Sequence, residues 1–235
     1  MEIREGSAPR CGMRRRERII ALGYLPIHVY LLPRLLGALC GAGVIDELGA
    51  NLLCYGFGAI ALLFLLWGFW RREFDKLCDY GPGALLEVVK SYGILLLCNL
   101  AVNLALLLID RTENPNNAAI FSMAETDLGS VAAVAVFLAP LVEEPLFRGG
   151  VFGTLRGRSR AAAYAVSMLL FALYHVWSFA LYDPANWLYV LQYLPAGFLL
   201  ARCYEKTNSL WTAVFLHMTV NGISILAISA MGAVL

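Results

Sequence analysis

The stretch Ile60-Ala61-Leu62-Leu63-Phe64-Leu65-Leu66-Trp67 decides the fold class, because it contains no charged or strongly polar side chain. A helix in a soluble protein needs a polar face toward water, and this stretch offers none. The rest of the chain agrees: of its 235 residues, 60% are hydrophobic and 15% are charged, and the mean hydropathy is +0.69. The sequence therefore predicts an all-α integral membrane protein and excludes secreted, collagenous and disordered chains.

Segments long enough to cross a bilayer recur along the chain. A bilayer core of about 30 Å requires about 20 apolar residues, each of which adds about 1.5 Å to a helix. We predict a polytopic transmembrane bundle of about seven spans, which are residues 19–40, 48–70, 86–109, 129–152, 161–181, 185–203 and 209–231. The first span is the weakest, since Pro26, His28, Pro33 and Arg34 interrupt it.

Basic residues gather in alternate connectors, and this pattern predicts how the chain is oriented. The basic connectors contain Arg4, Arg10, Arg14, Arg15, Arg16 and Arg18, then Arg71, Arg72 and Lys76, then Arg156, Arg158 and Arg160, and finally Arg202 and Lys206. The opposite connectors are acidic, with Arg111 as their only basic residue. We predict a cytoplasmic N-terminus and an outside C-terminus, in the plasma membrane if the host is a bacterium.

Charge and cysteine content exclude several other partners and cofactors. The net charge is +1, which gives no reason to expect nucleic acid as a partner. The six cysteines, at positions 11, 40, 54, 78, 98 and 203, form no C-x-x-C pair. We therefore expect neither a disulfide framework nor a zinc–thiolate site.

Three charged side chains, Glu143, Glu144 and Arg148, interrupt the fourth predicted span. A charge at the centre of a membrane helix costs roughly 2.5 to 3.5 kcal/mol even on the lenient insertion scale. Together the three charges would cost roughly 8 to 10 kcal/mol against lipid. We therefore expect them to face a protein interior or a water-filled cavity.

Helical spacing assigns different roles to the two glutamates. Glu144 and Arg148 are four residues apart and share a helix face, which favours an ion pair. Glu143 is rotated from that face by about 100°, so it is free of that partner and is the better candidate for a catalytic base. Pro145 removes one backbone donor, and it predicts a kink at Glu144 beside an aqueous pocket.

Two later spans contain histidines among apolar residues. His175 lies in the fifth predicted span, and His217 lies in the seventh, where it shares a helix face with Asn221. Counted from the helix ends at about 1.5 Å per residue, Glu143 and both histidines can meet at mid-depth. We therefore expect a carboxylate, two imidazoles and an amide to converge.

Such a set of side chains can activate water for hydrolysis of a peptide bond. A carboxylate can take a proton from water, an imidazole can pass it to the leaving amine, and an amide or second imidazole can stabilise the oxyanion. Glu143, His175 and His217 could instead bind a divalent metal such as zinc, which would generate the hydroxide. Both mechanisms stay open, although the lack of an i, i+4 histidine pair favours the version without metal.

Three short motifs stand in hydrophobic spans in a fixed order. They are Glu143-Glu144-x-x-x-Arg148, Phe171-x-x-x-His175 and His217-x-x-x-Asn221. Together they resemble the motifs of the CPBP family of intramembrane proteases, which includes CAAX proteases and bacteriocin-processing enzymes of the abortive-infection type. The resemblance covers approximately residues 130–225.

The resemblance implies an intramembrane endopeptidase with its catalytic core in residues 129–235. It implies catalytic roles for Glu143, His175, His217 and Asn221 and supporting roles for Glu144, Arg148 and Phe171. The preceding chain then divides into a basic cytoplasmic N-terminus, 1–18, and transmembrane helices, 19–128. The expected partners are the lipid bilayer and a peptide or protein substrate, lipidated or not, with no cofactor or a divalent metal.

Other interpretations of the same residues stay open. The three charges could form a buried cluster that only holds helices together, and Asn221 could serve only as a contact between helices. A non-enzymatic immunity or scaffold protein, or a proton-coupled carrier, would also contain intramembrane charges. We interpret His28, Arg34 and Lys90 as structural, because His28 has no motif partner and the other two suit lipid headgroups.

Overall fold

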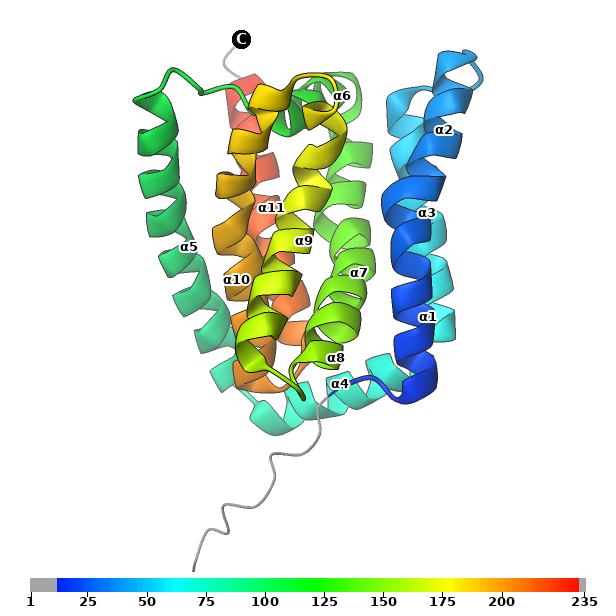
Figure 1. Ribbon diagram of the computed structural model, residues 1–235, viewed down its shortest axis with the longest axis vertical. Helices are drawn as coiled ribbons and strands as arrows, with labels where there is room; N and C mark the ends of the chain where they lie inside the picture. Colours follow the sequence, from blue (N-terminus) through cyan, green and yellow to red (C-terminus); the bar gives the residue numbers. More distant parts are fainter. Residues whose placement is uncertain (1–11, 233–235) are drawn as a thin grey trace, which may run out of the picture.

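The computed structural model describes residues 12–232, and every regular element in that part of the chain is a helix. Six helical segments in it are long and apolar enough to cross a membrane: Arg15–Gly41, Glu47–Leu65, Gly83–Leu107, Pro115–Leu155, Arg160–Ala180 and Leu210–Ala230. They stand side by side in one bundle (Figure 1). The predicted fold class, a polytopic helical membrane protein, is confirmed.

The first membrane segment is continuous despite its prolines. It consists of α1 (Arg15–Pro26), the π-helix η1 (Ile27–Leu31) and α2 (Leu32–Gly41). Pro26 and Pro33 lie on either side of η1, where the usual hydrogen-bond pattern of an α-helix is already interrupted. This segment stands beside α3 (Glu47–Leu65) at one edge of the bundle (Figure 1).

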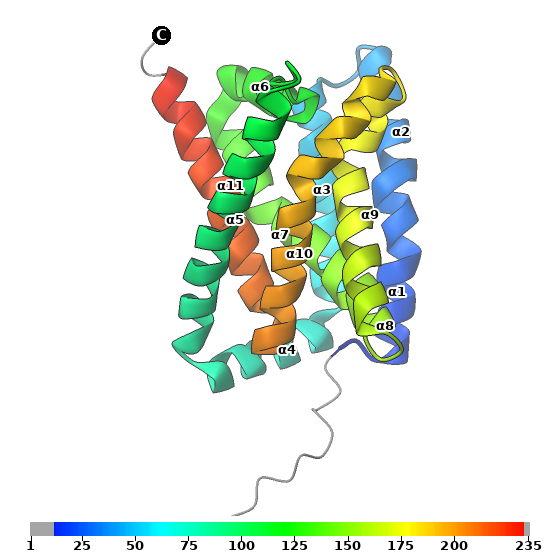
Figure 2. The same cartoon turned by 60° about the vertical axis from the view of Figure 1, so that its left-hand side comes forward.

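The predicted span 48–70 is wrong at its end. α3 stops before Leu66, whose backbone has φ −109° and ψ 17°. α4 (Trp67–Tyr80) then runs across the lower end of the bundle in both views (Figure 1 and Figure 2) and buries Phe69 and Trp70 against it. Because the apolar run continues into the first turn of α4, composition alone does not separate the two helices.

The predicted span 129–152 belongs to a longer helical run. Its parts are α6 (Pro115–Ala132), η2 (Ala133–Leu138), α7 (Ala139–Glu144), the π-helix η3 (Pro145–Phe152) and α8 (Gly153–Leu155). Asp127, with φ −153° and ψ 90°, marks a kink inside α6. At Pro145, where the sequence predicts a kink, the helix continues as η3, since a π-helical pattern accommodates the missing proline N–H.

The sixth predicted span, 185–203, is more polar than the other spans. It begins as the short helix η4 (Pro184–Tyr189), and Arg202, Glu205 and Lys206 lie near the end of the helix that follows. Because of these charges, the helix that follows η4 is not among the six segments that length and composition identify as able to cross a membrane. The helix is α10 (Val190–Thr207), and it packs against α5 (Gly83–Leu107), α9 (Arg160–Ala180) and α11 (Leu210–Gly232), as Figure 2 shows.

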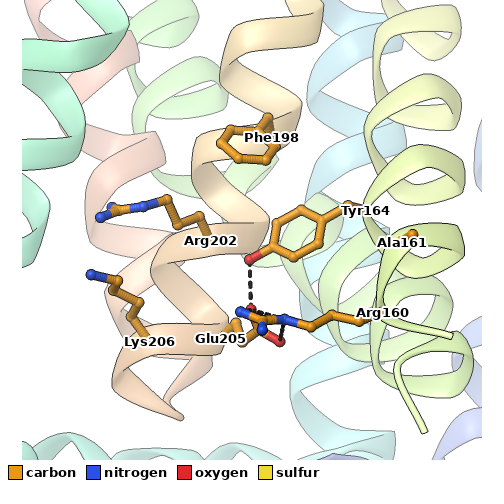
Figure 3. Close-up of a pocket in the computed structure, with 7 residues that line it drawn as sticks. All are labelled: Arg160, Ala161, Tyr164, Phe198, Arg202, Glu205 and Lys206. Carbon is orange, nitrogen blue, oxygen red and sulfur yellow. Dashed lines mark hydrogen bonds and ion pairs between the residues drawn. The ribbon is translucent and has the colours of Figure 1, made fainter.

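An ion-pair cluster joins α9 to α10 at the lower end of the bundle (Figure 3). Arg160 donates from Nε and Nη2 to both carboxylate oxygens of Glu205, at distances of 2.7 to 3.0 Å, and the Tyr164 hydroxyl donates to Glu205 at 2.8 Å. A hollow of about 530 Å³ beside the cluster is also lined by Arg202 and Lys206. None of the described motif residues lines this hollow, so it is separate from the candidate site.

We predict that a membrane-impermeant thiol reagent distinguishes the two ends of the bundle. In a background with all six native cysteines replaced, Thr112→Cys, between α5 and α6, should react in intact cells. Arg158→Cys, between α8 and α9, should react only after permeabilisation, because basic connectors stay in the cytoplasm. Labelling of Arg158→Cys in intact cells would show the opposite orientation.

Candidate active site

The three charges of the motif Glu143-Glu144-x-x-x-Arg148 are buried inside the bundle. Glu143 is 2% exposed, and Glu144 and Arg148 are 0% exposed. The two glutamates end α7, and Arg148 lies in η3. The expectation that the charges face a protein interior is therefore confirmed, as the cost of placing them in lipid requires.

The Glu144–Arg148 ion pair forms with the predicted i, i+4 spacing. Arg148 donates from Nη1 to Oε1 of Glu144 at 3.1 Å and from Nη2 to the backbone carbonyl of Gly197 on α10 at 3.2 Å. A Cβ atom on Gly197 would lie only 3.0 Å from the backbone of Met168, so glycine lets α10 approach α9 here. The guanidinium carbon of Arg148 lies 4.2 Å from the centroid of the Phe171 ring, a cation–π contact.

Glu144 also orients His217 on α11. The Nδ1 atom of His217 lies 2.8 Å from Oε1 of Glu144 and donates its N–H to that carboxylate. This contact leaves Nε2 of His217 at 4.0 Å from Oε2 of Glu143. The sequence predicts Glu144 only as the partner of Arg148, because no spacing rule links residues on separate helices.

His175 on α9 is fixed from two sides. Its Nδ1 lies 2.8 Å from the backbone carbonyl of Phe171, and its ring stacks on Tyr193 with the centroids 4.5 Å apart. A carbonyl only accepts hydrogen bonds, so Nδ1 carries the proton and Nε2 of the neutral ring presents a lone pair. That Nε2 lies 3.9 Å from Oε2 of Glu143.

The two oxygens of Glu143 have different surroundings. Oε1 accepts a hydrogen bond from the Tyr55 hydroxyl at 3.1 Å. Oε2 is buried and has no hydrogen-bond partner in the described part of the chain. Three electron-rich atoms, Oε2 of Glu143 and Nε2 of His175 and His217, therefore face a common space.

The separation of these three atoms suits one bridging water. Polar atoms more than 3.5 Å apart are commonly joined through a water molecule, which makes two hydrogen bonds of about 2.8 Å. A water in this space can donate one proton to Oε2 of Glu143 and the other to a histidine Nε2. Its oxygen lone pairs then stay available for attack on a carbonyl carbon.

A metal ion suits the same atoms less well. Ligand atoms bound to one tetrahedral zinc at about 2.0 to 2.2 Å lie roughly 3.3 to 3.6 Å apart, whereas the two histidines lie 3.9 and 4.0 Å from Glu143. Among the described residues, no group of three or more His, Cys, Asp or Glu side chains is arranged to hold a metal ion. Glu143, His175 and His217 would have to move closer together to bind one.

Asn221 lies one turn beyond His217 on α11. Its Nδ2 atom donates to the backbone carbonyl of Ala135 in η2 at 2.7 Å. This bond joins two helices and uses one of the two N–H groups of the amide. The predicted role of Asn221 in oxyanion stabilisation stays a prediction.

The structure adds three residues to the candidate site. Tyr55 contacts Glu143 directly, and Tyr174 and His28 follow Tyr55 in a chain of hydrogen bonds. Sequence analysis treats His28 as structural and assigns no role to the tyrosines. In the sequence, these residues stand out only as polar aromatic side chains near the middle of apolar spans. Many aromatic residues with a purely structural role have the same surroundings, so this pattern does not identify a site.

Comparisons with known proteins agree with the motifs. Residues 126–223 match the family model for the type II CAAX prenyl endopeptidase Rce1-like proteins. This segment contains every predicted catalytic and supporting residue. The resemblance that the three motifs indicate is therefore confirmed.

Two curated bacterial proteins are similar to part of the chain. The "UPF0177 protein YxdF" of Lactococcus lactis subsp. lactis (strain IL1403) is 33% identical over 84 residues, which are 36% of this chain and 42% of that protein. The "Putative membrane peptidase YdiL" of Bacillus subtilis (strain 168) is 26% identical over 110 residues, 46% of this chain and 41% of that protein. The chain thus spans less than half the length of these relatives. None of the solved structures gives a significant match.

We predict that Arg148→Ala lowers the stability of the protein. Without Arg148, Glu144 becomes an unpaired buried charge, which costs about 3 to 5 kcal/mol. Thermal unfolding of the purified protein in detergent should show a clear fall in the melting temperature. Arg160→Ala serves as the control, since the Arg160 side chain is 73% exposed and its loss should change the melting temperature little. Equal melting temperatures for both variants would contradict a structural role for the buried pair.

Proposed function

We propose that this protein is an intramembrane endopeptidase that hydrolyses a peptide bond in a membrane-associated or peptide substrate. The observation that carries the proposal is the convergence of Oε2 of Glu143 with Nε2 of His175 and His217, at 3.9 and 4.0 Å. No other described group competes for that oxygen. The family match supports the same class of reaction.

In the proposed mechanism, Glu143 is the general base. It takes a proton from the bridging water as the water oxygen attacks the carbonyl carbon of the substrate. His175, whose Nε2 lone pair faces the same carboxylate oxygen, accepts this proton from Glu143 and gives it to the nitrogen of the leaving amine as the C–N bond breaks, which returns Glu143 to the carboxylate and His175 to the neutral ring. The contact between Nδ1 of His175 and the Phe171 carbonyl fixes the ring, so Nε2 stays directed at the reacting atoms.

The developing oxyanion requires donors in the same space. When His217 is protonated, the Glu144 carboxylate stabilises the imidazolium, and Nε2 gains an N–H that can donate to the oxyanion. The second N–H of Asn221 is the other donor in this proposal, on the next turn of the same helix.

The surroundings of the site favour a substrate with an apolar segment in the bilayer. An apolar groove of about 270 Å³ is lined by Val29, Phe147, Leu173 and Trp177, and Tyr174 belongs to both the groove and the candidate site. A lipidated C-terminus fits such a groove, in keeping with the prenyl endopeptidase description of the matched family. A leader peptide or bacteriocin precursor is the second substrate class that we propose.

We predict that Glu143→Gln abolishes cleavage without loss of folded protein. The substitution keeps the size of the side chain and removes the base, which should lower kcat by about 100- to 10,000-fold. The assay uses purified protein with a library of prenylated C-terminal peptides and leader peptides, and Glu113→Gln on the exposed connector is the control. Turnover by Glu143→Gln within a few-fold of wild type would remove Glu143 from the mechanism.

The same assay separates the peptidase from its rivals. A scaffold or immunity protein would cleave none of the substrates, and its phenotype would survive Glu143→Gln. A proton-coupled carrier would also cleave none, and would instead show uptake that depends on the proton gradient.

We predict that chelation of metal ions leaves cleavage unchanged. Water activated by Glu143 and His175 needs no metal, so a strong chelator should not alter kcat. The measurement compares peptide cleavage before and after chelation and counts zinc, manganese and cobalt in the purified protein. Stoichiometric zinc that is lost together with activity and regained on re-addition would support the metal mechanism through Glu143, His175 and His217.

A further inference from the structure

A chain of polar side chains leads from Glu143 away from the two histidines. The Tyr55 hydroxyl lies 3.1 Å from Oε1 of Glu143 and 2.7 Å from the Tyr174 hydroxyl. The Tyr174 hydroxyl lies 3.2 Å from Nε2 of His28, whose Nδ1 lies 3.7 Å from Sγ of Cys54. The chain thus joins α7, α3, α9 and η1.

The chemistry of these groups fixes the direction of every proton in the chain. The Glu143 carboxylate only accepts, so Tyr55 donates to it, and the single proton of the Tyr55 hydroxyl is then used. Tyr55 must therefore accept from Tyr174, and Tyr174 must accept from the Nε2–H of His28. Nδ1 of His28 is left to accept from the thiol of Cys54. All four donors point toward the carboxylate.

The inner end of the chain is closed to solvent. His28 is 0% exposed and Cys54 is 7% exposed. The ring of Tyr24 stacks on His28 with centroids 5.9 Å apart, and the ring of Tyr55 meets it edge-on at 5.1 Å. In such surroundings, hydrogen bonds that follow one another reinforce each other, and no water is at hand to replace a lost donor.

A carboxylate has two equivalent oxygens, and the proposed mechanism uses only Oε2 of Glu143. The Tyr55 hydroxyl holds Oε1, and this leaves Oε2 facing His175 and His217. Without that donor, the carboxylate can rotate about its terminal bond and take Oε2 out of line with the water. A fixed neighbouring hydrogen bond is the usual way to keep a reacting group within a few tenths of an ångström of its productive position.

We propose that Tyr55 is a positioning residue for Glu143, and that Tyr174 and His28 fix the direction of its hydroxyl. This inference rests on the proposed peptidase function, because it concerns the efficiency of the same base. It also means that α3 and η1, which lie outside the matched segment 126–223, take part in the reaction.

The test is the kinetics of Tyr55→Phe, which removes one hydroxyl and keeps the ring. We expect kcat to fall by about 10- to 100-fold, as for loss of a hydrogen bond to a charged group, while KM and the melting temperature stay close to wild type. Tyr24→Phe is the matched control. The Tyr24 hydroxyl is buried in the same aromatic cluster but has no hydrogen-bond partner among the described residues, so its loss should leave kcat unchanged.

A second variant, Tyr174→Phe, tests the direction of the chain. It keeps the ring that lines the apolar groove and leaves the Tyr55 hydroxyl in place, but it removes the donor that orients this hydroxyl, so kcat should fall less than for Tyr55→Phe. If Tyr55→Phe does not yield folded protein, Tyr174→Phe decides the question.

The possible outcomes separate this inference from the proposed function. If the wild-type protein cleaves none of the substrates, the peptidase proposal itself fails. If the wild type cleaves and Tyr55→Phe keeps its kcat, or loses activity only through KM or through a lower melting temperature, the positioning role is overturned. Equal losses of kcat in Tyr55→Phe and Tyr24→Phe would also overturn it, because they would show an effect of packing alone.

Discussion

The buried ion pair between Glu144 and Arg148 is the interaction on which the rest of the site depends. Removing two charges from water costs several kcal/mol for each ion, and further partners offset part of that cost, although Oε2 of Glu144 and Nε of Arg148 have no hydrogen-bond partner among the described residues. Here the carbonyl of Gly197 accepts from Arg148, the ring of Phe171 lies against the guanidinium, and His217 donates to Glu144. These partners come from α10, α9 and α11, so the requirement to satisfy one pair fixes three helices around α7 and η3.

The adjacent glutamates differ because their surroundings differ. Glu144 has two strong donors on one oxygen, from Arg148 and His217, and it serves to hold other groups. Glu143 has one donor, from Tyr55, and its second oxygen faces lone pairs on two histidines. A rotation of one residue along the helix therefore separates a carboxylate that positions its neighbours from one that can act as a base. In other hydrolases, too, different surroundings give two neighbouring carboxylates separate roles.

The sequence predicts the features that depend on composition, segment length and residue spacing along one helix. Length, apolarity and the i, i+4 spacing of Glu144 and Arg148 give the helical bundle and the ion pair, and unusual charges in apolar spans give Glu143, His175 and His217. Local rules fail at α4, where an apolar run crosses the boundary between two helices. They also fail for contacts between distant helices, because a hydroxyl such as that of Tyr55 leaves no periodic pattern.

The position of Tyr55 follows from a close approach between α3 and α7. A Cβ atom on Gly58 would lie 3.1 Å from Val142 and 3.0 Å from the Tyr24 hydroxyl, so this residue must be small for the helices to come so near. Tyr55 precedes Gly58 by three residues, and Glu143 follows Val142 directly. The close contact between Gly58 and Val142 therefore lies within one helical turn of the hydrogen bond between Tyr55 and Glu143. A larger residue at position 58 would separate the two helices and lengthen the hydrogen bond to Glu143 without touching either of its partners.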